Sequence, residues 1–147
     1  ILEKLKKSDA ISTNFIFREL YRAGVKTEED KQKTSLEFFT NIENNLYTVC
    51  IRGAGNFSVR LYETLMMGRI PVVIASDAKL PLENYINWEK HLVITNSENI
   101  LKDLVVFHEK SSNEVLIEIQ KNNRELMLGL FQRVNYFAAL YQFKNEF

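Results

Sequence analysis

A glycine-containing loop lies between two apolar runs near the middle of the sequence. Residues 52–58 read RGAGNFS; they follow the strand-like run 47–51 and precede a segment that we expect to be helical to about Met67. Glycine has no Cβ, so Gly53 and Gly55 permit unusual backbone angles or the close approach of an anion. A helix that begins directly after such a loop points its free N–H groups and its positive dipole end at the same place. The loop therefore predicts a binding site for a phosphate group.

The expected helix after the loop carries a cation and a carboxylate on one face. Arg60 and Glu63 are three residues apart, whereas Val59, Tyr62 and Met66 form another stripe, which we expect to face the core. Arg60 can donate a bidentate pair of hydrogen bonds to a diphosphate, and Glu63 can accept two hydrogen bonds from vicinal ribose hydroxyls. The alternative is a surface ion pair worth roughly a few tenths of a kcal/mol. Spacing alone favours the ion pair.

A dinucleotide-binding fold is a further alternative for the same loop. The pattern V-x-I-x-G-A-G-x-x-S, with Asp77 about twenty residues further on, superficially resembles the NAD/FAD fingerprint. However, Ser58 stands where the fingerprint has a third Gly or Ala, and Pro71 lies at the start of the next strand. A partial glycine fingerprint is weak evidence for such a fold.

The elements that must position this loop alternate between strands and helices. Short β-rich runs occur at 11–17, 47–51, 70–75 and 92–95. Ser or Thr followed three residues later by Glu predicts helix starts at Thr34…Glu37, Thr95…Glu98 and Ser111…Glu114. Gly68 is a suitable residue to end the helix after the loop. The alternation predicts an α/β fold, a Rossmann-like parallel sheet flanked by helices.

The end of the chain is rich in aromatic residues. Residues 111–147 contain almost no Gly or Pro, and we expect them to form one or two helices. The last part of this segment contains six aromatic residues, Phe131, Tyr136, Phe137, Tyr141, Phe143 and Phe147. Aromatic side chains at this density usually pack on something. We expect them to pack on this domain's own core, and the alternative is docking on an absent domain or a second copy.

Length and composition restrict the class of protein. The chain has 147 residues and 46% hydrophobic content, which suits one domain, 1–147. Its 19 basic and 19 acidic residues balance without a basic block, so we expect no nucleic acid partner. No apolar run is long enough to span a membrane, and the first residues lack the apolar region of a signal peptide. Cys50 excludes an internal disulfide and is expected to be a buried hydrophobe. Because the sequence lacks a starting Met, we expect it to be part of a longer chain. One cysteine and no targeting segment favour a cytoplasmic location, and the alternative is a lumenal protein whose anchor lies outside this sequence.

The segment 46–95 resembles the exostosin family of glycosyltransferases as a unit. It has, in order, an aromatic-led strand ending in Arg-Gly, a Ser-x-Arg-x-x-Glu helix, a Gly-x-x-Pro-Val strand, then Leu-Pro and Ile-Asn-Trp. The resemblance, to enzymes of heparan sulfate and plant cell-wall synthesis, covers about a third of the chain. It implies an inverting transfer from a nucleotide sugar, usually a UDP-sugar, on a GT-B fold of two Rossmann-like halves. This chain would be the C-terminal, donor-binding half.

The resemblance also implies roles for individual residues. Arg60 would bind the diphosphate and Glu63 the ribose, while Arg52, Gly53 and Ser58 match the family's loop and helix start. Arg52 can instead be a solvated strand end. In the same segment Trp88 is expected to pack beneath the loop; the alternative is a stacking platform for uracil.

The absence of an Asp-x-Asp pair bears on the cofactor. Many other glycosyltransferases hold a metal on the donor diphosphate with such a pair, and this sequence has none. We expect no metal and no other cofactor, with arginine and helix-dipole charge stabilising the leaving nucleotide. The general base and the glycan acceptor are expected to depend on the missing N-terminal half. The alternatives are a non-catalytic nucleotide-binding or assembly module and an NAD/FAD-binding domain.

Overall fold

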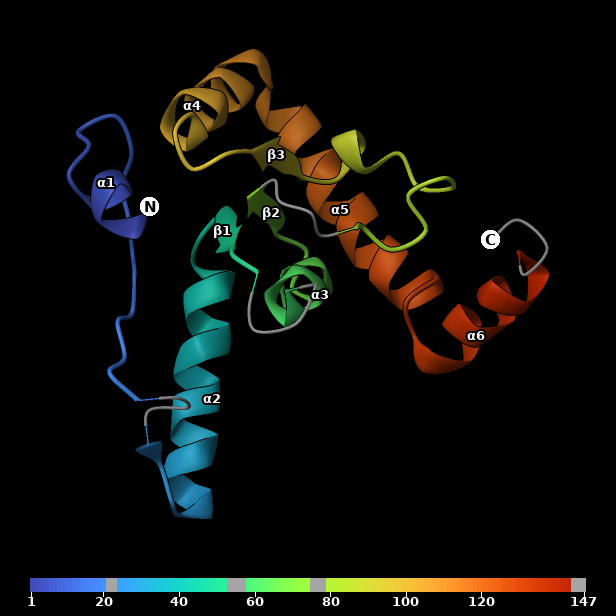
Figure 1. The fold of residues 1–147 in the computed structure, drawn as a ribbon, viewed down its shortest axis with the longest axis horizontal. Helices are drawn as coiled ribbons and strands as arrows, with labels where there is room; N and C mark the ends of the chain where they lie inside the picture. Colours follow the sequence, from blue (N-terminus) through green and yellow to red (C-terminus); the bar gives the residue numbers. More distant parts are fainter. Residues whose placement is uncertain (21–23, 53–57, 75–78, 144–147) are drawn as a thin grey trace.

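A three-stranded parallel sheet forms the centre of the computed structural model, which describes residues 1–20, 24–52, 58–74 and 79–143. The strands β1 (Tyr47–Cys50), β2 (Ile70–Ile74) and β3 (Val93–Thr95) lie in the order β1-β2-β3 (Figure 1). In the register, Tyr47 pairs with Ile70 and Val72 pairs with Val93. The expected α/β class, a parallel sheet flanked by helices with further helices at the C-terminus, is confirmed.

The helix α3 (Val59–Met66) connects β1 to β2, as parallel neighbours require. It ends as the sequence predicts, because Gly68 has a φ of +60° and a Cβ there would lie 3.2 Å from the Gln120 carbonyl oxygen. The N–H of Arg69 then donates to the Thr64 carbonyl at 3.0 Å. This turn directs the chain into β2.

The other helices differ in how near the sheet they lie. They are α1 (Leu2–Lys6), α2 (Glu28–Glu43), the 3-10 turn η2 (Trp88–Lys90), α4 (Ile100–Lys110), α5 (Asn113–Gly129) and α6 (Arg133–Gln142). Figure 1 shows α6 at the far end of α5, away from the sheet. Among the described residues, none of these helices is long and apolar enough to cross a membrane.

The three predicted helix starts are wrong in position. The helix α2 begins after Thr27, whose hydroxyl accepts from the Asp30 N–H at 3.1 Å, so Thr34 lies inside the helix. Before α4, Asn96 accepts the N–H groups of Glu98 and Asn99, while the Thr95 hydroxyl donates to Asp103. The α5 cap is Ser112 rather than Ser111. At α2 and α5 a nearby hydroxyl caps the helix, whereas Asn96 fixes the turn before α4.

The expected strand at 11–17 does not form. This segment runs beside α2, and the Asn14 carbonyl accepts from the Asn41 side-chain amide at 2.8 Å. Ile11 and Phe15 pack against the core through their side chains. Because the Asn14 carbonyl is bound by a helix side chain and not by β1, the segment stays outside the sheet.

The core has two clusters of buried residues. Alternate strand residues supply them, Val49 and Val72 to the first and Cys50 and Val73 to the second, so one cluster lies on each face of the sheet. The buried members of the first cluster are Leu5, Ile70, Val72, Val93, Ile100, Leu104 and Leu116. Those of the second are Cys50, Leu61, Leu65, Leu82, Ile86, Trp88 and Leu92.

The predicted core stripe of α3 is wrong in part. Leu61 and Leu65 are buried, whereas Val59 is 57% exposed and Tyr62 and Met66 are half-buried. The reason is that α3 packs on α5 as well as on β1 and β2. Its buried face is set by these neighbours, which the sequence around the helix does not show.

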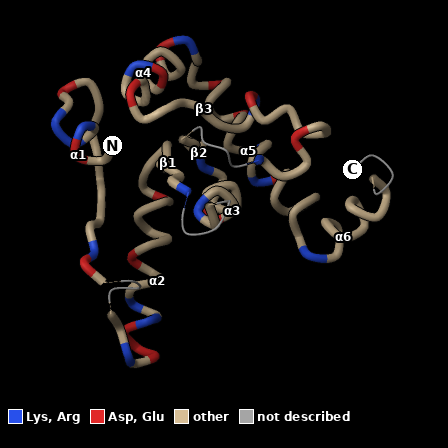
Figure 2. Tube along the Cα trace, in the orientation of Figure 1, with Lys and Arg blue, Asp and Glu red and all other residues tan. Residues whose placement is uncertain are grey.

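The C-terminal aromatic residues divide between two environments. Phe131, Tyr136 and Phe143 pack against the second core cluster, as expected. Phe137 is 65% exposed and Tyr141 is 71% exposed. Phe147 lies outside the described residues. Figure 2 shows charge on α6 only at its start, so its exposed face is mostly apolar.

Candidate functional site

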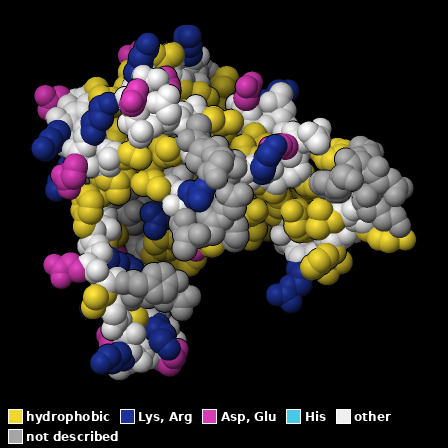
Figure 3. All heavy atoms as spheres, viewed as in Figure 1, with side chains coloured by type: hydrophobic (Ala, Val, Ile, Leu, Met, Phe, Trp, Pro, Cys, Tyr) yellow, Lys and Arg dark blue, Asp and Glu magenta, His cyan; other side chains and the backbone are white. Residues whose placement is uncertain are grey.

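A cleft of about 1250 Å³ opens beside β1. Its walls are the N-terminal segment 10–18, one face of α2, the strand β1, the first turn of α3 and the end of α4. Figure 3 shows a hollow with basic and apolar side chains around it in this face of the molecule. Most of the wall is apolar, and the few charged groups therefore determine what it can bind.

Three of the predicted site residues line this cleft together. They are Ser58, Arg60 and Glu63, all from the first two turns of α3 or its N-cap. Ser58 is the N-cap of α3, but its hydroxyl makes no capping hydrogen bond. Arg52 follows β1 and is exposed. Gly53 and Gly55 lie outside the described residues, so their predicted contact with an anion stays a prediction.

The Arg60 guanidinium lies over an aromatic ring. Its Cζ is 5.1 Å from the ring centroid of Phe38, on α2, which is within range of a cation–π interaction. Phe38 also lines the cleft. The exposed guanidinium is therefore held against one wall, with hydrogen-bond donors that can face a ligand.

The Glu63 carboxyl is half-buried in the same wall. Burial raises its pKa above the ordinary value of 4.5, and the nearby charge of Arg60 opposes this rise in part. Among the described residues, Arg60 and Glu63 form no ion pair with each other. The surface ion pair that spacing favours is thus not what the structure contains.

Two other residues near the loop have structural roles. Burial raises the pKa of the Cys50 thiol to about 12, so the thiol stays protonated and unreactive. Trp88 is 4% exposed and donates its indole N–H to the Pro81 carbonyl at 3.0 Å. The packing interpretation of Trp88 is confirmed, and a ring this buried offers no platform for a base.

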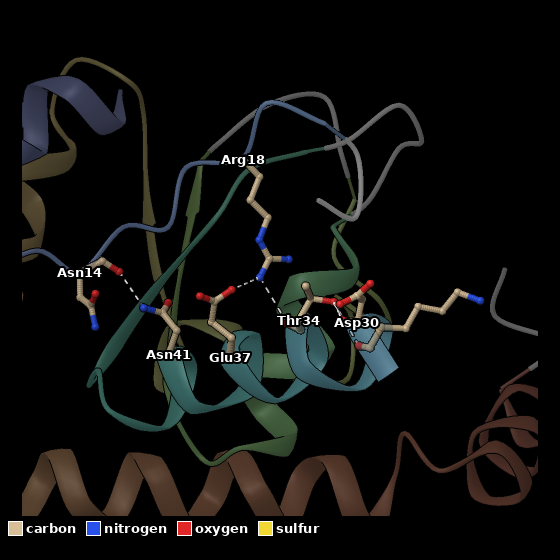
Figure 4. Close-up of polar contacts among 7 residues, drawn as sticks. Asn14, Arg18, Asp30, Thr34, Glu37 and Asn41 are labelled. Carbon is tan, nitrogen blue, oxygen red and sulfur yellow. Dashed lines mark hydrogen bonds and ion pairs between the residues drawn. The ribbon is translucent and has the colours of Figure 1, made fainter. Parts of the chain in front are cut away.

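Sequence reasoning missed Arg18, which lines the cleft from the N-terminal segment. Its Nη2 donates to Glu37 Oε2 at 2.6 Å and to the Thr34 carbonyl at 3.3 Å, both on α2 (Figure 4). The Asn41 amide holds the same segment through Asn14. The signal was weak, since Arg18 is a lone basic residue after a β-rich run.

Thr48 was also missed. It lies on β1 in the wall of the cleft, and its hydroxyl oxygen is buried without a hydrogen-bond partner in the described part of the chain. Buried polar atoms of this kind are rare in native proteins.

A metal centre is not evident within the described ranges. No group of three or more His, Cys, Asp or Glu side chains there could hold a metal ion. The basic side chains of Arg18 and Arg60 are the positive groups that the described cleft offers to an anion.

The fold and the cleft define an α/β domain with an arginine and a carboxylate at the start of a helix after a parallel strand. Comparison with known proteins identifies the family: the sequence model described as Exostosin GT47 domain matches residues 4–111. Because this is more than half of the chain, the protein belongs to the exostosin GT47 family of glycosyltransferases. The family match favours the transferase over the dinucleotide fold.

Individual relatives come from plants. A "Probable glucuronosyltransferase" of Oryza sativa subsp. japonica is 30% identical over 93 residues, which are 63% of this chain and 21% of the relative. A "Probable glucuronosyltransferase" of Physcomitrium patens is 32% identical over 43% of this chain and 14% of its own length. A "Probable beta-1,4-xylosyltransferase" of Arabidopsis thaliana is 30% identical over 43% of this chain and 15% of its own. The chain thus matches about a fifth or less of the length of these relatives.

Proposed function

We propose that this chain is the donor-binding part of an inverting glycosyltransferase that uses a nucleotide-diphosphate sugar, a UDP-sugar in particular. The observation that carries the proposal is that Arg60 and Glu63 line one cleft without forming an ion pair with each other. Family membership and relatives named as glucuronosyl- and xylosyltransferases support this reaction class.

In the proposed complex, each group of the α3 start has one task. The Arg60 fork binds the diphosphate, helped by the free N–H groups at the start of α3 and by its dipole. The ionised Glu63 accepts hydrogen bonds from the ribose hydroxyls. The Ser58 hydroxyl, not used in capping, donates to a phosphate oxygen. Arg52, Gly53 and Gly55 stay predictions of further contacts with the donor.

These positive groups also assist the chemistry. Negative charge develops on the diphosphate as the bond to the sugar breaks, and a fixed arginine stabilises that charge in the transition state. An inverting transfer further needs a general base beside the acceptor hydroxyl. We assign that base and the glycan acceptor to another part of the protein, an N-terminal half.

The exposed face of α6 suits the proposed contact with that half or with a second copy. Its apolar residues Val134, Phe137 and Tyr141 follow the spacing of one helix face. A cytoplasmic location and the GT-B arrangement of two halves stay predictions.

The test is a calorimetric titration of UDP and NAD into the wild type and into two variants. We expect UDP to bind more tightly than NAD, because α3 offers Arg60 and Glu63 and has Ser58 where the dinucleotide fingerprint has a third close-packing glycine. Arg60→Ala and Glu63→Ala should each weaken UDP binding about 10- to 100-fold, the scale of a hydrogen bond to a charged group. Tighter binding of NAD, or unchanged UDP affinity in both variants, contradicts the proposal.

A matched control pair lies on α5. Glu118 and Lys121 are also a carboxylate and a cation three residues apart, both are exposed, and neither lines the cleft. Glu118→Ala and Lys121→Ala change the net charge in the same way as the two site variants. They should leave the UDP affinity unchanged, which separates a specific site from a general effect of charge.

Chelation tests the proposal that no metal takes part. If Arg60 and the helix N–H groups supply the positive charge, UDP affinity should be the same with and without EDTA. Loss of most of the affinity on chelation, restored by manganese, would show that a cation carries the diphosphate.

A further inference from the structure

Two arginines reach the cleft from opposite walls, and both contact neighbouring residues of α2. Arg60 comes from α3 and lies over the ring of Phe38. Arg18 comes from the N-terminal segment and is paired with Glu37, the residue before Phe38 (Figure 4). The helix α2 therefore holds one guanidinium from each wall.

The charge of a diphosphate calls for more than one cation. Each phosphate offers oxygen pairs that match the donor fork of an arginine, and two forks can bind both phosphates at once. The cleft wall also contains two carboxylates, Glu63 and Glu109, which oppose anion binding. With Arg60 alone the described wall would have a net negative charge, and Arg18 restores the balance.

The ion pair between Arg18 and Glu37 is weak, so a ligand can replace it. The Glu37 side chain is 54% exposed and that of Arg18 is 25% exposed, so the Glu37 end of the ion pair faces solvent. Surface ion pairs are worth about 0–1 kcal/mol. A phosphate entering the cleft can therefore take the place of Glu37 at little cost, while Asn14 and Asn41 keep the segment on α2.

We propose that Arg18 is a second phosphate-binding residue of this cleft, which binds the donor diphosphate together with Arg60. Glu37 holds the guanidinium beside α2 until the ligand arrives and then competes with the ligand for it. The identification of the ligand as a nucleoside diphosphate rests on the function proposed above, whereas the role of Arg18 requires only a diphosphate.

The experiment is a titration of UDP, inorganic pyrophosphate and uridine into the wild type, Arg18→Ala and Glu37→Gln. We expect Arg18→Ala to weaken UDP and pyrophosphate about tenfold or more, because a charge-assisted pair is lost. Uridine, which has no phosphate, should bind all three proteins alike. Glu37→Gln should bind pyrophosphate as tightly as the wild type or more tightly, because the competing carboxylate is gone.

The opposite signs of these two variants exclude a merely structural role. Both remove the ion pair, and Arg18→Ala also removes the hydrogen bond to the Thr34 carbonyl, so a structural role predicts a loss of thermal stability and of affinity in both variants. That result would overturn the proposal, as would wild-type pyrophosphate affinity in Arg18→Ala or no pyrophosphate binding by the wild type. Arg133→Ala, which removes an exposed positive charge on α6 away from the cleft, is the control for net charge.

The outcomes also separate this proposal from the function proposed above. If Arg18→Ala weakens pyrophosphate binding while Arg60→Ala and Glu63→Ala leave UDP affinity unchanged, the donor site on α3 is wrong and the role of Arg18 stands. If only the α3 variants weaken binding, the donor site stands and the role of Arg18 is wrong.

Discussion

The two flanks of α3, one covered by α5 and one facing the cleft, differ in how far their polar side chains are hydrogen-bonded within the protein. On the flank covered by α5, Asn123 is fully buried and every polar atom of its amide is used. Its Nδ2 donates to the carbonyls of Arg69 and His91 at 2.9 and 2.8 Å, and its Oδ1 lies 2.9 Å from His91 Nδ1. Figure 1 shows α5 crossing this side of the domain. These groups stabilise the fold and are not available to a ligand.

Arginines on this flank also stabilise the fold. Arg69 donates to the Glu43 carbonyl, at the end of α2, and to Gln120 on α5. Arg124 donates to the Met66 carbonyl, at the end of α3. Both satisfy carbonyls that a helix end leaves unpaired.

The cleft flank contains an arginine and a carboxylate whose side chains are not paired with each other. Arg60 rests on an aromatic ring, Glu63 is half-buried with a raised pKa, and Thr48 has a buried hydroxyl without a described partner. Polar groups without partners lower the stability of a protein, and a ligand that binds them raises it. The difference assigns Arg69 and Arg124 to the fold and Arg60 to the cleft.

The largest effect should come from the core between the flanks. Leu65 is fully buried between α5 and the sheet, so Leu65→Ala should lower the free energy of unfolding by about 2–5 kcal/mol. Urea denaturation measures this. Val59→Ala, at the exposed position next to Arg60, should change the stability little. Equal effects of the two would mean that the buried face of α3 is misassigned.

The second effect tests whether the α5 flank is structural. Asn123→Ala leaves two carbonyls and a ring nitrogen without partners and should lower the free energy of unfolding by about 1–3 kcal/mol. UDP affinity, measured well below the melting temperature, should not change. Asn122→Ala, an exposed neighbour, is the control. A loss of UDP affinity in Asn123→Ala alone would erase the distinction between the flanks.

The sequence predicts the sheet but not the contacts of the cleft. Runs rich in Val and Ile predict β1, β2 and β3 correctly, because short buried strands have this composition. The run at 11–17 has a similar composition, yet Asn41 and not a strand takes its Asn14 carbonyl. The local composition of a run does not show whether its backbone pairs with a strand or with the side chain of a helix residue.

Some residues of the candidate site could also be grouped from the sequence, and others could not. Ser58, Arg60 and Glu63 are close in sequence, so their common location follows from one helix. Arg18 and Phe38 join them only through the path of the chain around α2. Contacts of this kind depend on tertiary packing and have no signature in helical spacing.

A smaller effect should come from the ring beneath Arg60. Phe38→Leu keeps the apolar volume but removes the cation–π interaction, worth about 0.5–2 kcal/mol. UDP affinity should fall several-fold, and Phe38→Tyr should restore it. Phe137→Leu, exposed on α6 and outside the cleft, is the control and should have no effect on binding. If the Phe38→Leu variant binds UDP as tightly as the wild type, the ring does not position Arg60.

The smallest effect is a pH dependence that belongs to Glu63. Burial raises the pKa of its carboxyl in the folded state above 4.5, so this group stabilises the fold fully below that pH. The contribution is lost as the pH rises through the raised pKa. Glu63→Gln does not ionise, and thermal melts from about pH 4 to 7 should therefore show its stability gaining on the wild type as the pH rises.

Binding should follow the opposite direction in the same pH range. Ionised Glu63 accepts hydrogen bonds from ribose hydroxyls better than the protonated acid, so wild-type affinity should rise as the pH passes the raised pKa. Uridine is the ligand to use, since it carries no phosphate that titrates. Affinity of Glu63→Gln for uridine should be independent of pH. If the wild type is equally flat, the Glu63 carboxyl serves the fold alone, like the Asn123 amide on the other flank.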